Sequence, residues 1–179
     1  MSHRLFAALP VPDAVAERLL PLRTDLFGAR WRQREHFHIT LHFYGSVEIE
    51  MAEEIAQALE QVSQPMMQLQ VDGVGWFGRK EPHLIHARIA SDPALDELAE
   101  DCRRIARRLG LKTEARAFRP HITLAYCHHT PLADVMTWSE TYQTLKTSSF
   151  MADEFHLYES FTGSRRQSRY QVQASYRLG

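Results

Sequence analysis

The feature that most constrains this chain is a four-residue motif, His-Ile-Thr-Leu, which occurs twice, at residues 38–41 and 121–124. Each copy follows a similar stretch of sequence. Residues 4–9 and 84–89 are short apolar runs typical of buried strands, and each run leads through a helical pattern and a loop into the motif. The chain therefore repeats one unit of strand, helix, loop and strand, which indicates two equivalent halves.

The remaining pattern is that of a mixed α and β protein. Apolar residues recur at helical spacing in residues 12–26, 49–62 and 93–109, and they alternate as in strands in residues 68–74, 154–158 and 170–176. The helix over residues 93–109 has typical boundary residues, namely Ser91 or Asp92 as its N-cap, Pro93 in its first turn and Gly110 after its end. We therefore predict an α+β fold with two antiparallel sheets and helices on their outer faces.

The motif also predicts which side chains each strand presents, because successive side chains of a strand point to opposite faces. The apolar set that we expect to face the core consists of Phe37, Ile39, Leu41 and Phe43 in the first copy and Ile122 and Leu124 in the second. The set that we expect to face away from the core consists of His38, Thr40 and His42, and of His121, Thr123 and Ala125. Each strand thus offers an imidazole and a hydroxyl on one side, roughly 6.6 Å apart.

Two imidazoles and two hydroxyls suit the hydrolysis of a phosphodiester. In-line attack needs a base on the entering water and an acid on the departing oxygen, and histidine can serve as either at neutral pH. We expect His38 and His121 to be this acid–base pair, without a metal ion. The hydroxyls of Thr40 and Thr123 can donate to the non-bridging oxygens, where negative charge builds up in the transition state.

A metal site is one alternative. His36, His38 and His42 alternate on one strand, and His128 and His129 follow the second motif. Three histidines on one strand face can hold zinc with an open coordination position, although no carboxylate or cysteine completes an obvious ligand set.

A binding module that holds RNA ends without cutting them is a second alternative. Trp31, Phe37, Trp76 and Phe77 can stack on bases, although such aromatic residues are more often part of a core. The presence of both histidines and both threonines favours the enzyme over the module.

The charge pattern and the cysteines constrain partners and location. The net charge of −1 gives no overall field that would hold a polyanion, but residues 103–119 contain seven basic residues and one acid, Glu114. This stretch is either a solvated helix face or a basic wall beside an anionic ligand. Cys102 and Cys127 form no disulfide framework or zinc motif, and no apolar run is long enough for a membrane span or a signal peptide. We expect a cytoplasmic protein without a membrane partner.

The paired motifs resemble those of the two-histidine phosphoesterase superfamily, and in particular the bacterial RNA 2′,3′-cyclic phosphodiesterases, also called 2′-5′ RNA ligases. The resemblance covers nearly the whole chain, through residues 4–8, 36–45, 118–125 and 155–160 and Tyr170. It implies a single bilobal domain over residues 1–179, in which two interleaved, pseudo-symmetric lobes line a central groove.

The resemblance also implies a function in RNA processing. A terminal 2′,3′-cyclic phosphate would be hydrolysed to a 2′-phosphate, with His38 as the proton donor to the leaving O3′ and His121 as the acceptor from water. The alternative activities are 2′,5′-phosphodiesterase and 2′-5′ RNA ligase. The implied partner is an RNA or oligonucleotide with a cyclic phosphate end, no cofactor is needed, and we expect a monomer.

One position departs from the family pattern. Members of this type often carry an arginine two residues after the second motif's leucine, and this chain has Tyr126 there. A phenol cannot reproduce the bidentate phosphate contact of a guanidinium. We expect the missing charge to come from Arg119, which would bind the substrate phosphate with Thr40 and Thr123, or from Arg88 or the pair at residues 165–166. The alternatives are that the substrate phosphate is held more weakly or that the substrate differs.

Overall fold

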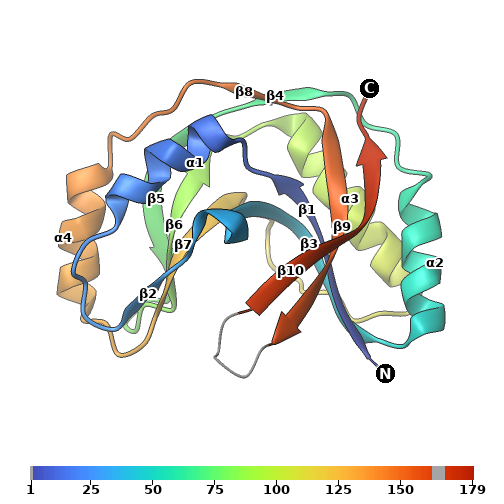
Figure 1. Cartoon of the computed structure of the whole chain (residues 1–179), viewed down its shortest axis with the longest axis horizontal. Coiled ribbons are helices and arrows are strands. Elements are labelled where there is room, and N and C mark those ends of the chain that lie inside the picture. Colours follow the sequence, from blue (N-terminus) through green and yellow to red (C-terminus); the bar gives the residue numbers. More distant parts are fainter. Residues whose placement is uncertain (1, 163–167) are drawn as a thin grey trace.

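The computed structural model describes residues 2–162 and 168–179, and its centre is an eight-stranded antiparallel sheet (Figure 1). The strand order is β10-β9-β1-β3-β7-β6-β5, with β2 paired to β7 beside this path. The strands are β1 (His3–Pro10), β2 (Ala29–Trp31), β3 (His38–Val47), β5 (Val71–Phe77), β6 (Leu84–Ile89), β7 (His121–Cys127), β9 (Glu154–Thr162) and β10 (Ser168–Arg177). A separate two-stranded sheet pairs β4 (Met67–Leu69) with β8 (Phe150–Ala152).

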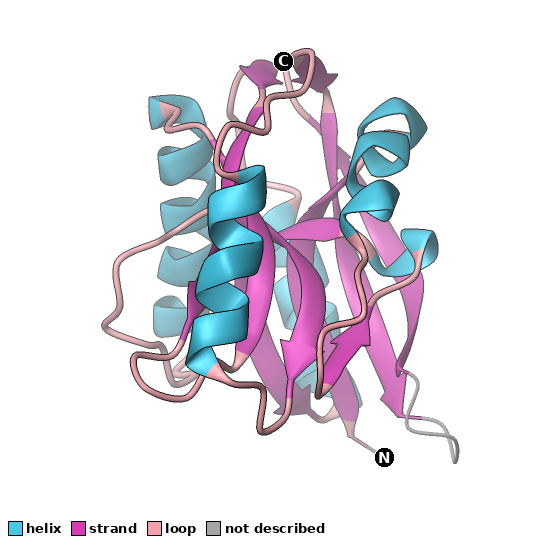
Figure 2. Cartoon of the chain, turned by 90° about the vertical axis from the view of Figure 1, so that its left-hand side faces the viewer, coloured by secondary structure: helices cyan, strands magenta, loops and turns pink. Residues whose placement is uncertain are grey.

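Helices cover the outside of the sheet, which confirms the predicted α+β class. They are α1 (Asp13–Leu19), α2 (Ile49–Leu59), α3 (Pro93–Arg108) and α4 (Leu132–Tyr142), with short 3-10 turns at Leu20–Leu22 and Arg34–His36. Helices α2 and α3 pack beside β1 and β3, whereas α4 packs beside β5. Figure 1 shows α2 and α3 on one side and α1 and α4 on the other, and Figure 2, seen from the α4 side, shows helices in front of the strands. In the described part of the chain, no helix is both long and apolar enough to cross a membrane.

The two halves of the sheet join at its centre. Strand β3 of the first half pairs antiparallel with β7 of the second half at Ile39 and Ile122, which are both fully buried. The prediction of two separate sheets is therefore wrong in this respect, because the two motif strands are neighbours within one sheet. The apolar faces of both halves contribute to one core cluster.

Several element boundaries differ from the sequence-based prediction. The first helix ends at Leu19 rather than near Leu26, because Pro21 lacks the N–H that would continue it, and a 3-10 turn follows. The second ends at Leu59 rather than at Val62. Helix α4 and strands β2 and β8 were not predicted. Only Val135 and Trp138 of α4 are buried, which leaves too short an apolar pattern to identify the helix from sequence.

Each motif strand contains a β-bulge at the leucine of its motif. Thr40 faces Ala8 and His42 faces Ala7, so Leu41 is an extra residue in β3; Leu124 is likewise extra in β7 relative to β6. A bulge interrupts the alternation of side chains, and it does so just after the threonine in both copies. The His-x-Thr part of each motif therefore keeps the predicted face, whereas the residues after it do not.

The bulges explain three wrong predictions of orientation. Phe43 is 45% exposed instead of buried, and Tyr44 is buried in its place, where its hydroxyl donates to the carbonyl of Cys102 in α3. His42 does not share the face of His38, since its ring lies 5.0 Å from that of Tyr44. Ala125, directly after the bulge at Leu124, is fully buried like Leu124 itself instead of facing away from the core.

Candidate active site

The two motif histidines are held by the same hydrogen bond. The Nδ1 of His38 lies 2.8 Å from the carbonyl oxygen of His36, and the Nδ1 of His121 lies 2.7 Å from the carbonyl oxygen of Arg119. A carbonyl can only accept, so Nδ1 carries the proton in both rings and Nε2 is the nitrogen left for chemistry. In both copies the accepting carbonyl belongs to the residue two positions before the histidine. The two repeats are therefore equivalent in the tautomer of the histidine as well as in sequence.

The pairing of β3 with β7 brings the four motif side chains to one face of the sheet. Ile39 and Ile122 point into the core, so the residues that flank them point to the opposite face. Across such an antiparallel pair, His38 and His121 are diagonal neighbours, which typically lie roughly 7–8 Å apart, with their Cβ atoms somewhat closer. The hydroxyls of Thr40 and Thr123 have no hydrogen-bond partner among residues 2–162 and 168–179, so both can donate to a ligand.

The ring of His38 is surrounded by aromatic side chains. Its centroid lies 4.9 Å from that of Phe6, 5.3 Å from that of Tyr170 and 6.3 Å from that of Tyr158. Burial among these rings lowers the pKa of His38 to about 4, against the hydrogen bond to His36, which raises it. The positive charge of Arg32 lowers this pKa further, and it also contributes to the lowered pKa of His36, after burial.

The ring of His121 has different neighbours. Phe77 stands edge-on to it at 4.9 Å, and the ring of His86 lies 5.0 Å away. Burial lowers the pKa of His121, and the hydrogen bond to Arg119 opposes this shift. His86 is 5% exposed, and burial followed by the nearby His121 lowers its pKa to about 3, so His86 is neutral at pH 7.

A pocket of about 520 Å³ opens beside His86, which is a volume typical of small-molecule sites. Phe77, Arg88 and Arg119 are among its lining residues. The side chain of Arg119 is exposed in this pocket, and its carbonyl oxygen orients His121. Arg88 donates from Nε to the carbonyl of Asp72 at 3.3 Å, on the β5 side of the pocket. The pair at residues 165–166 lies outside the described residues.

The histidines considered as zinc ligands do not converge. The Nε2 of His36 lies 2.6 Å from the carbonyl oxygen of Ser168, and His42 lies on the face of β3 toward α3. His128 and His129 are exposed, with their rings 4.3 Å apart. Within the described ranges, no group of three His, Cys, Asp or Glu side chains is placed to hold a metal ion.

The aromatic residues considered for base stacking divide into two groups. Phe37 is 8% exposed and belongs to the core, and Trp31 packs against Trp138 at 6.1 Å. Trp76 and Phe77 line the pocket beside His86. Only the latter two of these four aromatic residues therefore lie at the pocket beside His86, whereas Trp31 and Phe37 line a separate, smaller pocket.

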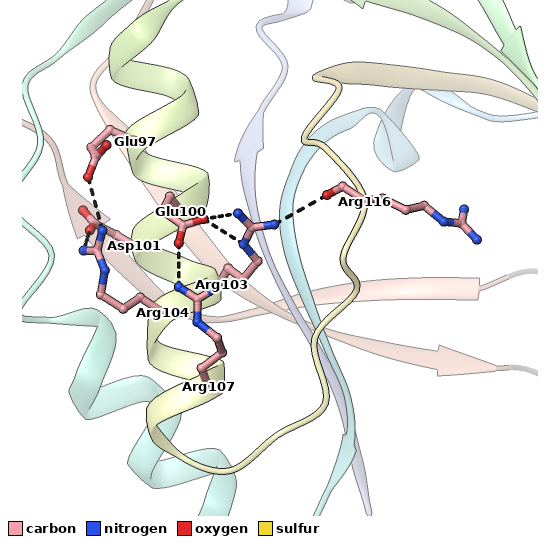
Figure 3. A network of polar contacts seen from close by, with 7 residues as sticks. All are labelled: Glu97, Glu100, Asp101, Arg103, Arg104, Arg107 and Arg116. Carbon is pink, nitrogen blue, oxygen red and sulfur yellow. Dashed lines mark hydrogen bonds and ion pairs between the residues drawn. The ribbon is translucent and has the colours of Figure 1, made fainter.

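The basic stretch over residues 103–119 is largely neutralised on α3 (Figure 3). Arg103 and Arg107 both bond to Glu100, and Arg104 bonds to Asp101 and Glu97. These acids lie one to two turns earlier in the helix, so a count over residues 103–119 omits them. The part of the stretch on α3 is a solvated helix face, and these three arginines do not form a basic wall, whereas residues 109–119 lie beyond the helix and place Arg119 at the pocket.

Sequence reasoning did not assign five residues to the site. Phe6, Tyr158 and Tyr170 surround His38, His86 contacts His121, and Arg32 lies near His38. One signal was available in the sequence: Phe6 and His86 occupy the strands that precede the motifs in the two repeats. No local signal distinguished Arg32 from the other arginines in its loop.

Comparison with known proteins supports the family resemblance. The model of the 2′-5′ RNA ligase superfamily matches residues 11–163. An RNA 2′,3′-cyclic phosphodiesterase of Aeropyrum pernix is 29% identical over 115 residues, which span 63% of this chain and 61% of the relative. The Thermotoga maritima protein of the same name is 30% identical over 135 residues, with 72% of both chains covered.

The same family appears among solved structures. Escherichia coli LigT in complex with 3′-AMP superimposes with a TM-score of 0.81 and 27% identity, covering 99% of both chains. A structure described as a phosphoesterase gives the same TM-score with 26% identity and 99% coverage of both chains. The match of the family model over most of the sequence, together with the shared fold, shows that this chain belongs to the 2′-5′ RNA ligase superfamily.

Proposed function

We propose that this protein is an RNA 2′,3′-cyclic phosphodiesterase that hydrolyses a terminal 2′,3′-cyclic phosphate to a 2′-phosphate by metal-independent acid–base catalysis. The observation that carries the proposal is the matched pair of imidazoles. His38 and His121 lie on adjacent antiparallel strands, and each is fixed through Nδ1 with Nε2 left free. The relatives named RNA 2′,3′-cyclic phosphodiesterase support the choice of substrate.

In the proposed reaction, water attacks phosphorus as the bond from phosphorus to O3′ breaks. The Nε2 of His121 takes a proton from the water, and the Nε2 of His38 gives a proton to O3′. The products are a 2′-phosphate and a 3′-hydroxyl, and the two histidines return to their starting states by proton exchange with solvent. The assignment of acid to His38 and base to His121 follows the family resemblance.

The hydroxyls of Thr40 and Thr123 have the second role in this mechanism. Each can donate to a non-bridging oxygen, where charge accumulates during attack. The side chain of Arg119 lines the pocket beside His86, where it can contact the phosphate or the adjacent nucleotide.

The product of 2′,3′-cyclic AMP tests the reaction. We expect adenosine 2′-phosphate, with undiminished turnover after dialysis against a chelator. A 3′-phosphate product, or no turnover, would contradict the proposal.

A sulfur-substituted substrate tests the roles of the histidines. When the 3′ bridging oxygen is replaced by sulfur, the leaving thiolate needs no proton. We expect this substrate to restore much of the activity of His38→Ala but not that of His121→Ala. The opposite pattern would exchange the two roles while leaving the reaction intact.

A further inference from the structure

Arg32 is a half-buried cation beside His38, and no carboxylate neutralises it among the described residues. Its behaviour differs from that of Arg103, Arg104 and Arg107, which all pair with acids on α3. Placing an unpaired charge partly out of water is unfavourable unless a ligand or other groups compensate for it. The surroundings of Arg32 therefore bear on what it binds.

Both the main chain and the side chain of Arg32 are fixed. Its N–H donates to the carbonyl of Leu124 at 2.7 Å, which ties the end of β2 to the second motif strand. The guanidinium lies 5.2 Å from the ring centroid of Tyr126 and 5.8 Å from that of Tyr170. Its Nη2 also donates to the hydroxyl of Tyr170 at 3.0 Å. Contacts with aromatic rings stabilise a guanidinium without neutralising its charge.

These contacts leave the charge available at the His38 end of the site. Arginine has five N–H donors, and the hydrogen bond to Tyr170 uses one of them. The ring of Tyr170 stands edge-on to that of His38 at 5.3 Å, and the charge of Arg32 contributes to the lowered pKa of His38, after burial. A planar cation with free donors beside the reacting groups is suited to phosphate oxygens.

We propose that Arg32 binds the substrate phosphate at the His38 end of this site, and that Tyr126 and Tyr170 are the residues that position it. For the identity of the ligand the proposal rests on the phosphodiesterase function proposed above. Tyr126 then holds the guanidinium of Arg32 in place. Strand β2 pairs with β7 at Arg30 and Tyr126, and this pairing brings Arg32, just after β2, close to the ring of Tyr126. Arg119 and Arg88 instead lie at the pocket beside His86.

Calorimetric titration with adenosine 2′-phosphate and with adenosine tests the proposal. We expect Arg32→Gln to weaken the binding of adenosine 2′-phosphate by about 10- to 100-fold, the usual range for hydrogen bonds to a charged group. The binding of adenosine should be unaffected. Arg32→Lys should fall between, because lysine keeps the charge but loses the planar fork. Arg104→Gln removes the same charge on α3 and should bind like wild type.

A second measurement separates a phosphate contact from a merely structural role. Without the positive charge of Arg32, the pKa of His38 in the free protein should rise, as followed by NMR. Tyr170→Phe should weaken the binding of adenosine 2′-phosphate less than Arg32→Gln does, since the positive charge of Arg32 remains. Wild-type affinity in Arg32→Gln, an equal loss for both ligands, or an unchanged pKa of His38 would overturn the proposal.

The outcomes also separate this proposal from the function on which it rests. If Arg32→Gln hydrolyses 2′,3′-cyclic AMP with wild-type kcat and KM, the role of Arg32 is wrong and the function stands. If the wild type does not turn over this substrate but binds adenosine 2′-phosphate through Arg32, the function is wrong and the phosphate site stands.

Discussion

The His38 half and the His121 half of the site share one scaffold but differ in what surrounds the imidazole. Both rings are fixed through Nδ1 by a carbonyl two residues earlier, and both strands have a bulge at the motif leucine. Around His38, however, lie three aromatic rings and the cation of Arg32, whereas His121 contacts Phe77 and a neutral imidazole, His86. Equivalent backbones therefore carry unequal electrostatic environments, which is a way to give two identical side chains different proton affinities.

Replacing the histidine of either half should have the largest effect on activity. We expect His38→Ala and His121→Ala each to lower kcat on 2′,3′-cyclic AMP by about 10²- to 10⁴-fold, the range for loss of one acid or base. Both variants should keep the melting temperature within a few degrees of wild type, because both histidines are only partly buried. His128→Ala, at an exposed histidine, is the control and should be fully active. Near-wild-type rates in both site variants would refute the acid–base pair.

Features of the site that depend on neighbouring residues in the sequence were predicted, whereas features that depend on contacts between distant segments were not. The face of His38 and Thr40 depends only on strand alternation, so the motif alone predicted it correctly. The bulge at Leu41 depends on pairing with β1, and it reversed the predicted orientations of His42 and Phe43. Local periodicity carries no information about such a pairing.

The charges of the site were harder to predict. Arg103, Arg104, Arg107 and Arg108 are four basic residues within six positions, and yet acids on the same helix pair with the first three of them. Arg32, which has no ion pair among the described residues, is identified only by contacts with Tyr126 and Tyr170, which are about 90 or more positions away in the sequence. Helix α4 was not predicted for a different reason, namely that its few buried residues do not form a long apolar stripe.

The pH dependence of catalysis gives the next largest effect. In the proposed mechanism the productive enzyme has His121 neutral and His38 protonated, and burial lowers the pKa of both, that of His38 to about 4. The pH dependence of kcat/KM reports the pKa values of the free enzyme. Because both are lowered, kcat/KM should have its maximum below pH 6.5 and should fall as the pH rises above 6.5. A bound phosphate anion raises both pKa values, so the maximum of kcat should lie at higher pH. A kcat/KM that rises from pH 6.5 to 8.5 would contradict this assignment.

The threonines should have smaller and similar effects in the two halves. Thr40→Val and Thr123→Val remove a hydroxyl at nearly constant volume, and each should lower kcat/KM by about 10- to 100-fold, as expected for a hydrogen bond to a charged group. Thr40→Ser and Thr123→Ser keep the hydroxyl and should stay close to wild type. A loss in only one of the two valine variants would show that one half alone binds the non-bridging oxygens.

The smallest expected effect concerns stability in acid and is specific to the His121 half. The ordinary pKa of histidine is about 6.5, and His86 in the folded protein has a pKa of about 3, so the unfolded chain binds more protons between these values. This contribution to stability is complete above pH 6.5 and is lost as the pH falls toward 3. In His86→Phe this titration is absent, so the free energy of unfolding should decrease less between pH 7 and pH 4.5 than in wild type. Urea unfolding at both pH values measures that difference within each protein, so a constant packing change from the new ring cancels. If the two proteins lose equal stability over this interval, His86 is not the buried neutral group that distinguishes the surroundings of His121 from those of His38.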